Sequence, residues 1–175
     1  MRWALFAVVL YVVVVVQTAL VPFIEVQSVR PDLLVLLAVY LALAAPTAEA
    51  LLAGWIIGFA VDLNSLSFAP ASNVGAFALV YGMTVLVIVQ LRRFTFRDHG
   101  VTYFMSVFAA ALAIHAAVNA HTLYVTGQSD RWIDALAIST GTAFYTALIS
   151  PYAHWVCRRH RAMLGLAPAR TSHAR

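Results

Sequence analysis

The sequence predicts an all-α membrane protein, a polytopic bundle of six transmembrane helices. Hydrophobic residues make up 63% of the 175 residues, and charged residues only 10%. A soluble domain of this length cannot bury so much apolar surface, whereas a bilayer solvates it. Long apolar runs alternate with short polar breaks, and arginines gather on one side of these runs. Together, these observations indicate that the chain crosses a membrane several times.

Six apolar segments are expected to form the spans: residues 3–24, 31–45, 48–66, 74–91, 101–125 and 132–156. The second segment would extend over about 22 Å, short of a hydrocarbon core of about 30 Å. It either continues through Pro46 with a kink or dips at one surface. Residues 1–157 are therefore expected to form one six-span transmembrane domain. Residues 158–175, basic and then rich in Ala, Pro and Ser, are expected to form a disordered cytoplasmic tail.

The distribution of arginine predicts the orientation. With the N-terminus inside, only Arg30 and Arg131 fall on the outer side. The cytoplasmic side then holds the other nine: Arg2, Arg92, Arg93, Arg97, Arg158, Arg159, Arg161, Arg170 and Arg175. This excess follows the positive-inside rule and, with an even number of spans, predicts that both termini are cytoplasmic. Nucleic-acid binding is not expected, because the arginines lie at helix ends rather than in one polar patch.

The third span carries a face of small residues. Gly54, Gly58 and Asp62 follow one another at four-residue spacing, so they share one face of a helix. In lipid, small residues allow two helix backbones to approach closely, and a carboxylate needs a polar partner. This face is expected to pack inside the bundle or to dock a partner helix. Further small residues of this kind are Gly75, Gly82 and Ser139.

Two other polar arrangements are candidates for a function. Asp62 and Arg30 would lie on the same outer side, where they either form an ion pair or each reach interfacial water. His115 and Asn119 stand four residues apart on the fifth span. They either line a polar pocket that binds a small ligand or relays protons, or simply bridge two helices by hydrogen bonds.

Catalysis is not expected. The sequence shows no nucleophile–base motif, no phosphate-binding glycine loop and no paired-carboxylate active site. No third ligand is spaced to complete a metal site with His115 and Asn119. We therefore predict a protein that is not an enzyme, with no catalytic residue, no bound cofactor and no metal ion.

Two motifs resemble those of the rod shape-determining protein MreD family. The first is Arg30-Pro31-Asp32, followed by an apolar run to Leu43. The second is Gly54-x-x-x-Gly58-Phe-x-x-Asp62-Leu63, followed by Pro70 and then by Asn73-x-Gly75-Ala76. The resemblance covers the first half of the chain, while the second half agrees only in hydropathy. The segment after Asp62 lacks the glycine-bearing turn often present in the family.

This resemblance implies a multi-pass protein of the bacterial inner membrane, in the elongasome that determines rod cell shape. It would be a non-enzymatic scaffold that couples cytoskeletal filaments to peptidoglycan synthesis. The implied partners are MreC most directly, MreB, RodA and an elongation-specific penicillin-binding protein in the wider complex, and membrane lipid. The family fold is similar to the substrate-binding subunit of energy-coupling-factor transporters. The alternative function is therefore a substrate-binding membrane subunit of a small-molecule (vitamin) transporter.

Overall fold

The computed structural model describes residues 1–65, 75–92 and 100–160. They form six α-helices: α1 (Trp3–Ala19), α2 (Leu33–Ala44), α3 (Thr47–Ser65), α4 (Ala76–Leu91), α5 (Gly100–Thr126) and α6 (Trp132–Arg159). Two 3-10 helices, η1 (Val21–Ile24) and η3 (Ser129–Arg131), precede α2 and α6. Within the described ranges no strand is present, which confirms the expected all-α class.

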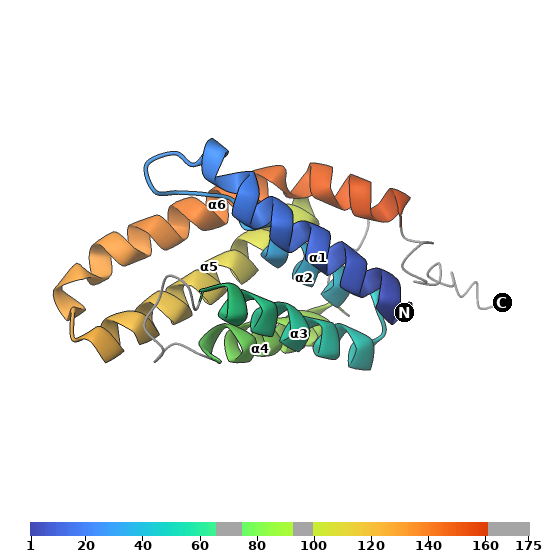
Figure 1. Ribbon diagram of the computed structural model, residues 1–175, viewed down its shortest axis with the longest axis horizontal. Helices are drawn as coiled ribbons and strands as arrows, with labels where there is room; N and C mark the ends of the chain where they lie inside the picture. Colours follow the sequence, from blue (N-terminus) through green and yellow to red (C-terminus); the bar gives the residue numbers. More distant parts are fainter. Residues whose placement is uncertain (66–74, 93–99, 161–175) are drawn as a thin grey trace.

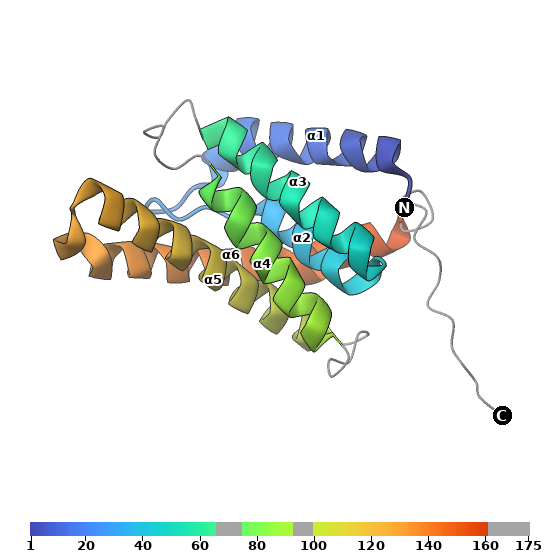
Figure 2. The same cartoon turned by 90° about the horizontal axis from the view of Figure 1, so that it is seen from below.

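Helix α2 lies at the centre of the bundle (Figures 1 and 2). It packs against each of the other five helices. Every residue from Leu34 to Ala42 is buried, as expected for a helix that is apolar on all sides. The remaining helices include two hairpins, α3–α4 and α5–α6, whose members pack most extensively on each other. Figure 2 shows α1 running along one edge of this arrangement.

The ends of α2 are set by polar groups and by Pro46. Asp32 is the N-cap, and its carboxylate accepts hydrogen bonds from the backbone N–H groups of the first turn. The helix therefore starts at Leu33, slightly later than predicted. Ala45 has extended backbone angles, as expected for a residue before proline, and α3 begins directly after Pro46. The expected alternative of one helix kinked through Pro46 is wrong.

Arg92, at the end of α4, supports the other end of α2. Its guanidinium donates hydrogen bonds to the carbonyl oxygens of Ala42 (3.0 Å) and Ala45 (2.6 Å). It also donates to the hydroxyl of Thr47 (2.9 Å), at the start of α3. A cation at a helix C-terminus donates hydrogen bonds to carbonyls that have no partner within the helix. It also interacts favourably with the negative end of the helix dipole. Arg92 thus joins α2, α3 and α4, a role that the sequence analysis, which used Arg92 only to orient the chain, did not predict.

The other helix boundaries agree closely with the predicted segments. The first segment is α-helical only to Ala19 and continues as η1, which contains Pro22. Helix α6 extends through Arg159, beyond the predicted start of the tail. Residues 161–175, the remainder of that predicted tail, lie outside the described residues. So do residues 93–99, which include the predicted cytoplasmic residues Arg93 and Arg97.

Three of the described helices are long and apolar enough to cross a membrane: Thr47–Asn64 within α3, and all of α5 and α6. Helices α1, α2 and α4 are also apolar but shorter. The α5–α6 hairpin extends beyond the other helices at one end of the bundle (Figure 1). The structure therefore supports a membrane protein with three candidate spans, while the six-span topology stays a prediction.

Candidate functional site

A buried carboxylate, Asp32, lies where several helices meet. Its Oδ1 accepts hydrogen bonds from the N–H groups of Leu34 (2.9 Å) and Val35 (3.1 Å). Its Oδ2 accepts a hydrogen bond from the hydroxyl of Tyr81 on α4 (3.2 Å). The same Oδ2 lies 3.2 Å from Nε2 of His115 on α5. These two atoms are within ion-pair distance, although the contact does not meet hydrogen-bond geometry.

The backbone around Asp32 is held from two further helices. The Asp32 N–H donates to the hydroxyl oxygen of Thr146 on α6 (2.9 Å). From α1, the Gln17 amide donates to the Pro31 carbonyl (3.1 Å) and accepts from the Leu33 N–H (2.8 Å). We call the five residues that meet here the Asp32 cluster: Gln17, Asp32, Tyr81, His115 and Thr146. Through it, the start of α2 is bonded to or in contact with α1, α4, α5 and α6.

The Asp32 cluster is largely shielded from solvent. Tyr81 and Thr146 are fully buried, Asp32 is 8% exposed, and His115 is partly exposed. A carboxylate in such a place is costly unless hydrogen-bond donors and opposite charge surround it. Here two backbone N–H groups and the tyrosine hydroxyl donate hydrogen bonds to the carboxylate, and the imidazole lies within ion-pair distance of it. The cluster therefore holds helices in fixed relative positions.

Helices α3 and α4 approach closely through glycines. A Cβ atom at Gly58 would lie 2.6 Å from the carbonyl oxygen of Phe77 and 2.7 Å from Cα of Ala78. A Cβ at Gly54 would lie 2.8 Å from a Val85 methyl group, and one at Gly82 would lie 2.6 Å from the Trp55 ring. The face predicted from the spacing of Gly54 and Gly58 is thus a packing surface within the bundle. Gly82 contributes to it from the opposite helix.

Asp62 completes this α3–α4 interface. Its carboxylate, only 1% exposed, accepts hydrogen bonds from the N–H groups of Phe77 (3.2 Å) and Ala78 (2.8 Å). These are first-turn N–H groups of α4, which have no partner within their own helix. Gly75 is the N-cap of α4, with φ +90°, and offers no side chain for this purpose. Asp62 therefore caps α4 from the neighbouring helix.

The remaining sequence-predicted residues lie apart from one another. Arg30 is exposed, and no contact between Arg30 and Asp62 occurs among the described residues, so the structure does not support that pair. Asn119 donates a hydrogen bond from Nδ2 to the Ser139 hydroxyl (2.9 Å), which joins α5 to α6. His115 contacts Asp32 instead. His115 and Asn119 thus contact different partners, and each joins two helices.

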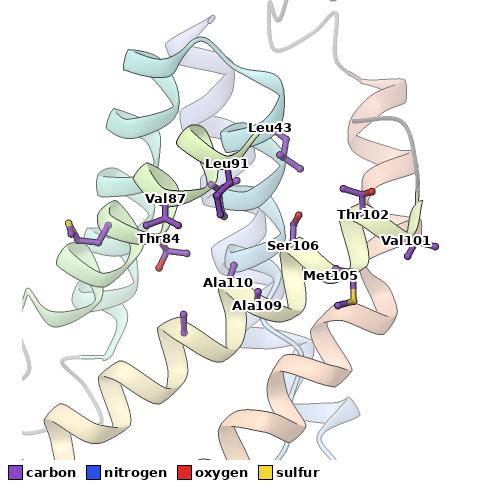
Figure 3. Close-up of a pocket in the computed structure, with 13 residues that line it drawn as sticks. Leu43, Thr84, Val87, Leu91, Val101, Thr102, Met105, Ser106, Ala109 and Ala110 are labelled. Atoms are coloured by element: carbon purple, nitrogen blue, oxygen red, sulfur yellow. The ribbon is translucent and has the colours of Figure 1, made fainter. Parts of the chain in front are cut away.

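An open groove lies between α4 and α5, and no residue of the Asp32 cluster lines it (Figure 3). Its volume is about 790 Å³, and Leu43 of α2 also lines it. Most of the lining side chains are apolar, but Thr84, Thr102 and Ser106 contribute hydroxyl groups. No cluster of three or more His, Cys, Asp or Glu side chains able to hold a metal ion exists in the described part of the chain.

Sequence reasoning missed most of the Asp32 cluster. A signal existed for Asp32 itself, because an acidic residue immediately before an apolar run is a typical N-cap. Tyr81 and Thr146 gave no such signal, since both lie within apolar segments far away in the sequence.

The fold and these contacts define a helical membrane protein in which buried polar side chains join helices. The sequence model described as "rod shape-determining protein MreD" matches residues 1–155. The chain belongs to this family, a family of membrane proteins with a structural role in rod shape determination. No curated protein and no solved structure matches the chain. The expected similarity to energy-coupling-factor transporter subunits therefore stays a prediction.

Proposed function

We propose that this chain is a non-enzymatic scaffold of the bacterial elongation complex, where it couples cytoskeletal filaments to peptidoglycan synthesis. Family membership supports the role in rod shape. The observation that supports a scaffold function is that buried polar side chains join the helices to one another. Asp32, Asp62 and Asn119 each form contacts that join helices. Such contacts favour a stable arrangement of helices, which a scaffold needs.

The proposed topology has six spans in the bacterial inner membrane with both termini in the cytoplasm. The arginine distribution supports this orientation. Together, α1 and η1 extend the first apolar segment from Trp3 to Ile24, although α2 and α4 stay shorter than a typical span. Because α2 is buried among the other helices, it need not match the full bilayer thickness by itself.

The proposed partners are MreC most directly, then MreB, RodA and an elongation-specific penicillin-binding protein, together with membrane lipid. The faces predicted for packing or docking, at Gly54, Gly58 and Gly82, are occupied by the α3–α4 interface. We therefore assign these glycines to packing within the chain. Partner binding would use other surfaces of the bundle.

The vitamin-transporter alternative is less well supported. A binding subunit needs polar side chains that are available to a ligand, and in this chain His115 and Asn119, together with the carboxylate Asp62, could supply them. In the structure, Asp62 caps α4, Asn119 bonds Ser139, and His115 contacts Asp32. All three side chains are thus engaged in contacts between helices.

Copurification tests the proposed partners. The tagged full-length chain, extracted from a rod-shaped host in a mild detergent, should recover MreC in a fixed ratio to the bait. An unrelated multi-pass membrane protein with the same tag is the control. Recovery of transporter ATPase subunits in place of MreC would contradict the scaffold and favour the transporter alternative.

A further inference from the structure

The groove between α4 and α5 extends over only part of a membrane span (Figure 3). Its lining begins with Leu91, the last residue of α4, and Val101, the second residue of α5, and it ends at Met83 and Ala113. Along α5 this is about 18 Å, against about 15 Å for half of the hydrocarbon core. A transmembrane helix needs a contact surface along the whole core, whereas an acyl chain of one leaflet occupies half of it. The groove therefore fits a lipid chain better than a partner helix.

Three hydroxyl groups in the groove are available to an occupant. Elsewhere in the bundle, hydroxyls such as those of Thr140 and Thr146 donate hydrogen bonds to a carbonyl of their own helix. Within the described ranges, the hydroxyls of Thr84, Thr102 and Ser106 form no hydrogen bond. Thr102 lies in the first turn of α5, and Ser106 lies one turn further along. These two hydroxyls can therefore donate to the phosphate or ester oxygens of a lipid.

The end of the groove at the start of α5 carries positive charge. Arg92 follows Leu91 directly as the C-cap of α4, and the N-terminus of α5 is the positive end of its helix dipole. First-turn N–H groups have no partner within their own helix and readily bind phosphate. None of the described residues that line the groove is acidic. The arginine distribution predicts that this end is cytoplasmic, and anionic lipids concentrate in the cytoplasmic leaflet.

We propose that the groove between α4 and α5 binds an anionic phospholipid of the cytoplasmic leaflet. One acyl chain lies along the apolar lining, and the phosphate lies at the start of α5, beside Thr102. The groove and the surrounding lipid are equally apolar, so the selectivity of the site comes from the head group. This inference rests on the membrane topology proposed above, which sets the leaflet, and not on the scaffold function.

Native mass spectrometry of the purified full-length chain tests the site, with phosphatidylglycerol and phosphatidylcholine of identical acyl chains added in turn. Thr102→Asp puts a carboxylate in the first turn of α5, where it favours the helix but repels a phosphate. Thr102→Asn is the uncharged control of similar size. Ala109→Phe fills the groove, because Ala109 lines it and is exposed. Its matched control is Ala120→Phe, at an exposed position of α5 outside the groove.

We expect the wild type, Thr102→Asn and Ala120→Phe to retain phosphatidylglycerol in preference to phosphatidylcholine. Thr102→Asp should bind phosphatidylglycerol about fivefold more weakly, the effect of one charge near a lipid head group. Ala109→Phe should lose the preference altogether. Should Ala109→Phe fail to fold, the two variants at Thr102 decide the matter alone.

Equal retention of the two lipids by the wild type would overturn the proposal. So would wild-type retention of phosphatidylglycerol by Thr102→Asp or by folded Ala109→Phe. If Ala109→Phe lost a copurified membrane partner but still bound phosphatidylglycerol, the groove would belong to a partner helix instead. Lipid retention in detergent does not depend on orientation, so cysteine labelling at Thr95 tests the topology separately.

Discussion

Gly58→Ala tests the close approach of α3 and α4. The added Cβ would lie 2.6 Å from the Phe77 carbonyl oxygen and 2.7 Å from Ala78 Cα, whereas ordinary contacts begin at 3.4 Å. Both atoms belong to the backbone, so no side-chain rotation relieves the clash. The two helices would have to separate by about 0.8 Å, with loss of dispersion contacts along the interface.

Overpacking of this kind lowers the stability of the folded chain by about 1–3 kcal/mol, while the higher helix propensity of Ala raises it by about 0.8–1.0 kcal/mol relative to Gly. The separation would also lengthen the hydrogen bonds from Phe77 and Ala78 to Asp62, and a lost cap costs about 1 kcal/mol. The expected net destabilisation is about 1–3 kcal/mol. Gly58→Leu, with a much larger side chain, should prevent the native packing and lower the folded yield.

The assay is thermal unfolding of the purified chain in detergent, with Gly100→Ala as the matched control. A Cβ at Gly100, the first residue of α5, would meet no atom within 4 Å. Gly54→Ala should be intermediate, because its Cβ meets the Val85 side chain rather than backbone. If Gly58→Ala were as stable as Gly100→Ala, the close α3–α4 contact would be refuted.

Three further predictions concern other contacts and the topology. Asp62→Ala should destabilise the chain by about 1–3 kcal/mol because it leaves two N–H groups of α4 unpaired, whereas Ala at the exposed Asp130 should change stability little. Asn119→Leu should cost about 1 kcal/mol or less, from the lost bond to Ser139, and leave cell shape intact. A cysteine at Thr95 should react with an impermeant thiol reagent only after the cytoplasmic side is opened.

Each of these has a clear contradicting result. Equal melting temperatures for the Ala variants at Asp62 and Asp130 would show that the Asp62 cap contributes nothing. Complete loss of function in Asn119→Leu, with normal folding, would indicate that the Asn119 amide binds a ligand. Labelling of Thr95→Cys from the periplasm of intact cells would reject the six-span topology.

The sequence was most informative where the cause of a contact is local. Gly54 and Gly58 share a helix face because of their spacing, and a Cβ at either position would meet atoms of α4. Helix ends were predictable for the same reason, since Pro46 and the polar residues that flank the apolar runs act within a few residues. Partners brought together by the fold were not predictable. Asp62 bonds the backbone of α4, which carries no sequence signal, and not Arg30.

The Asp32 cluster shows the same limit. Its members come from five helices, and Asp32 and Thr146, which are bonded to each other, are 114 residues apart along the chain. Hydropathy places each of them in an apolar segment or at its edge, but does not give the rotation of one helix against another. The pairing of His115 with Asp32 rather than with a ligand depends on that rotation.

Depletion of the chain in a rod-shaped host is the most direct test of the proposed scaffold. Cell width is measured together with the rescue of growth by added vitamins. The scaffold function predicts that depleted cells widen and become round while vitamin uptake stays normal, and that the wild-type chain restores the width. Normal cell shape, with a growth defect that excess vitamin corrects, would contradict it.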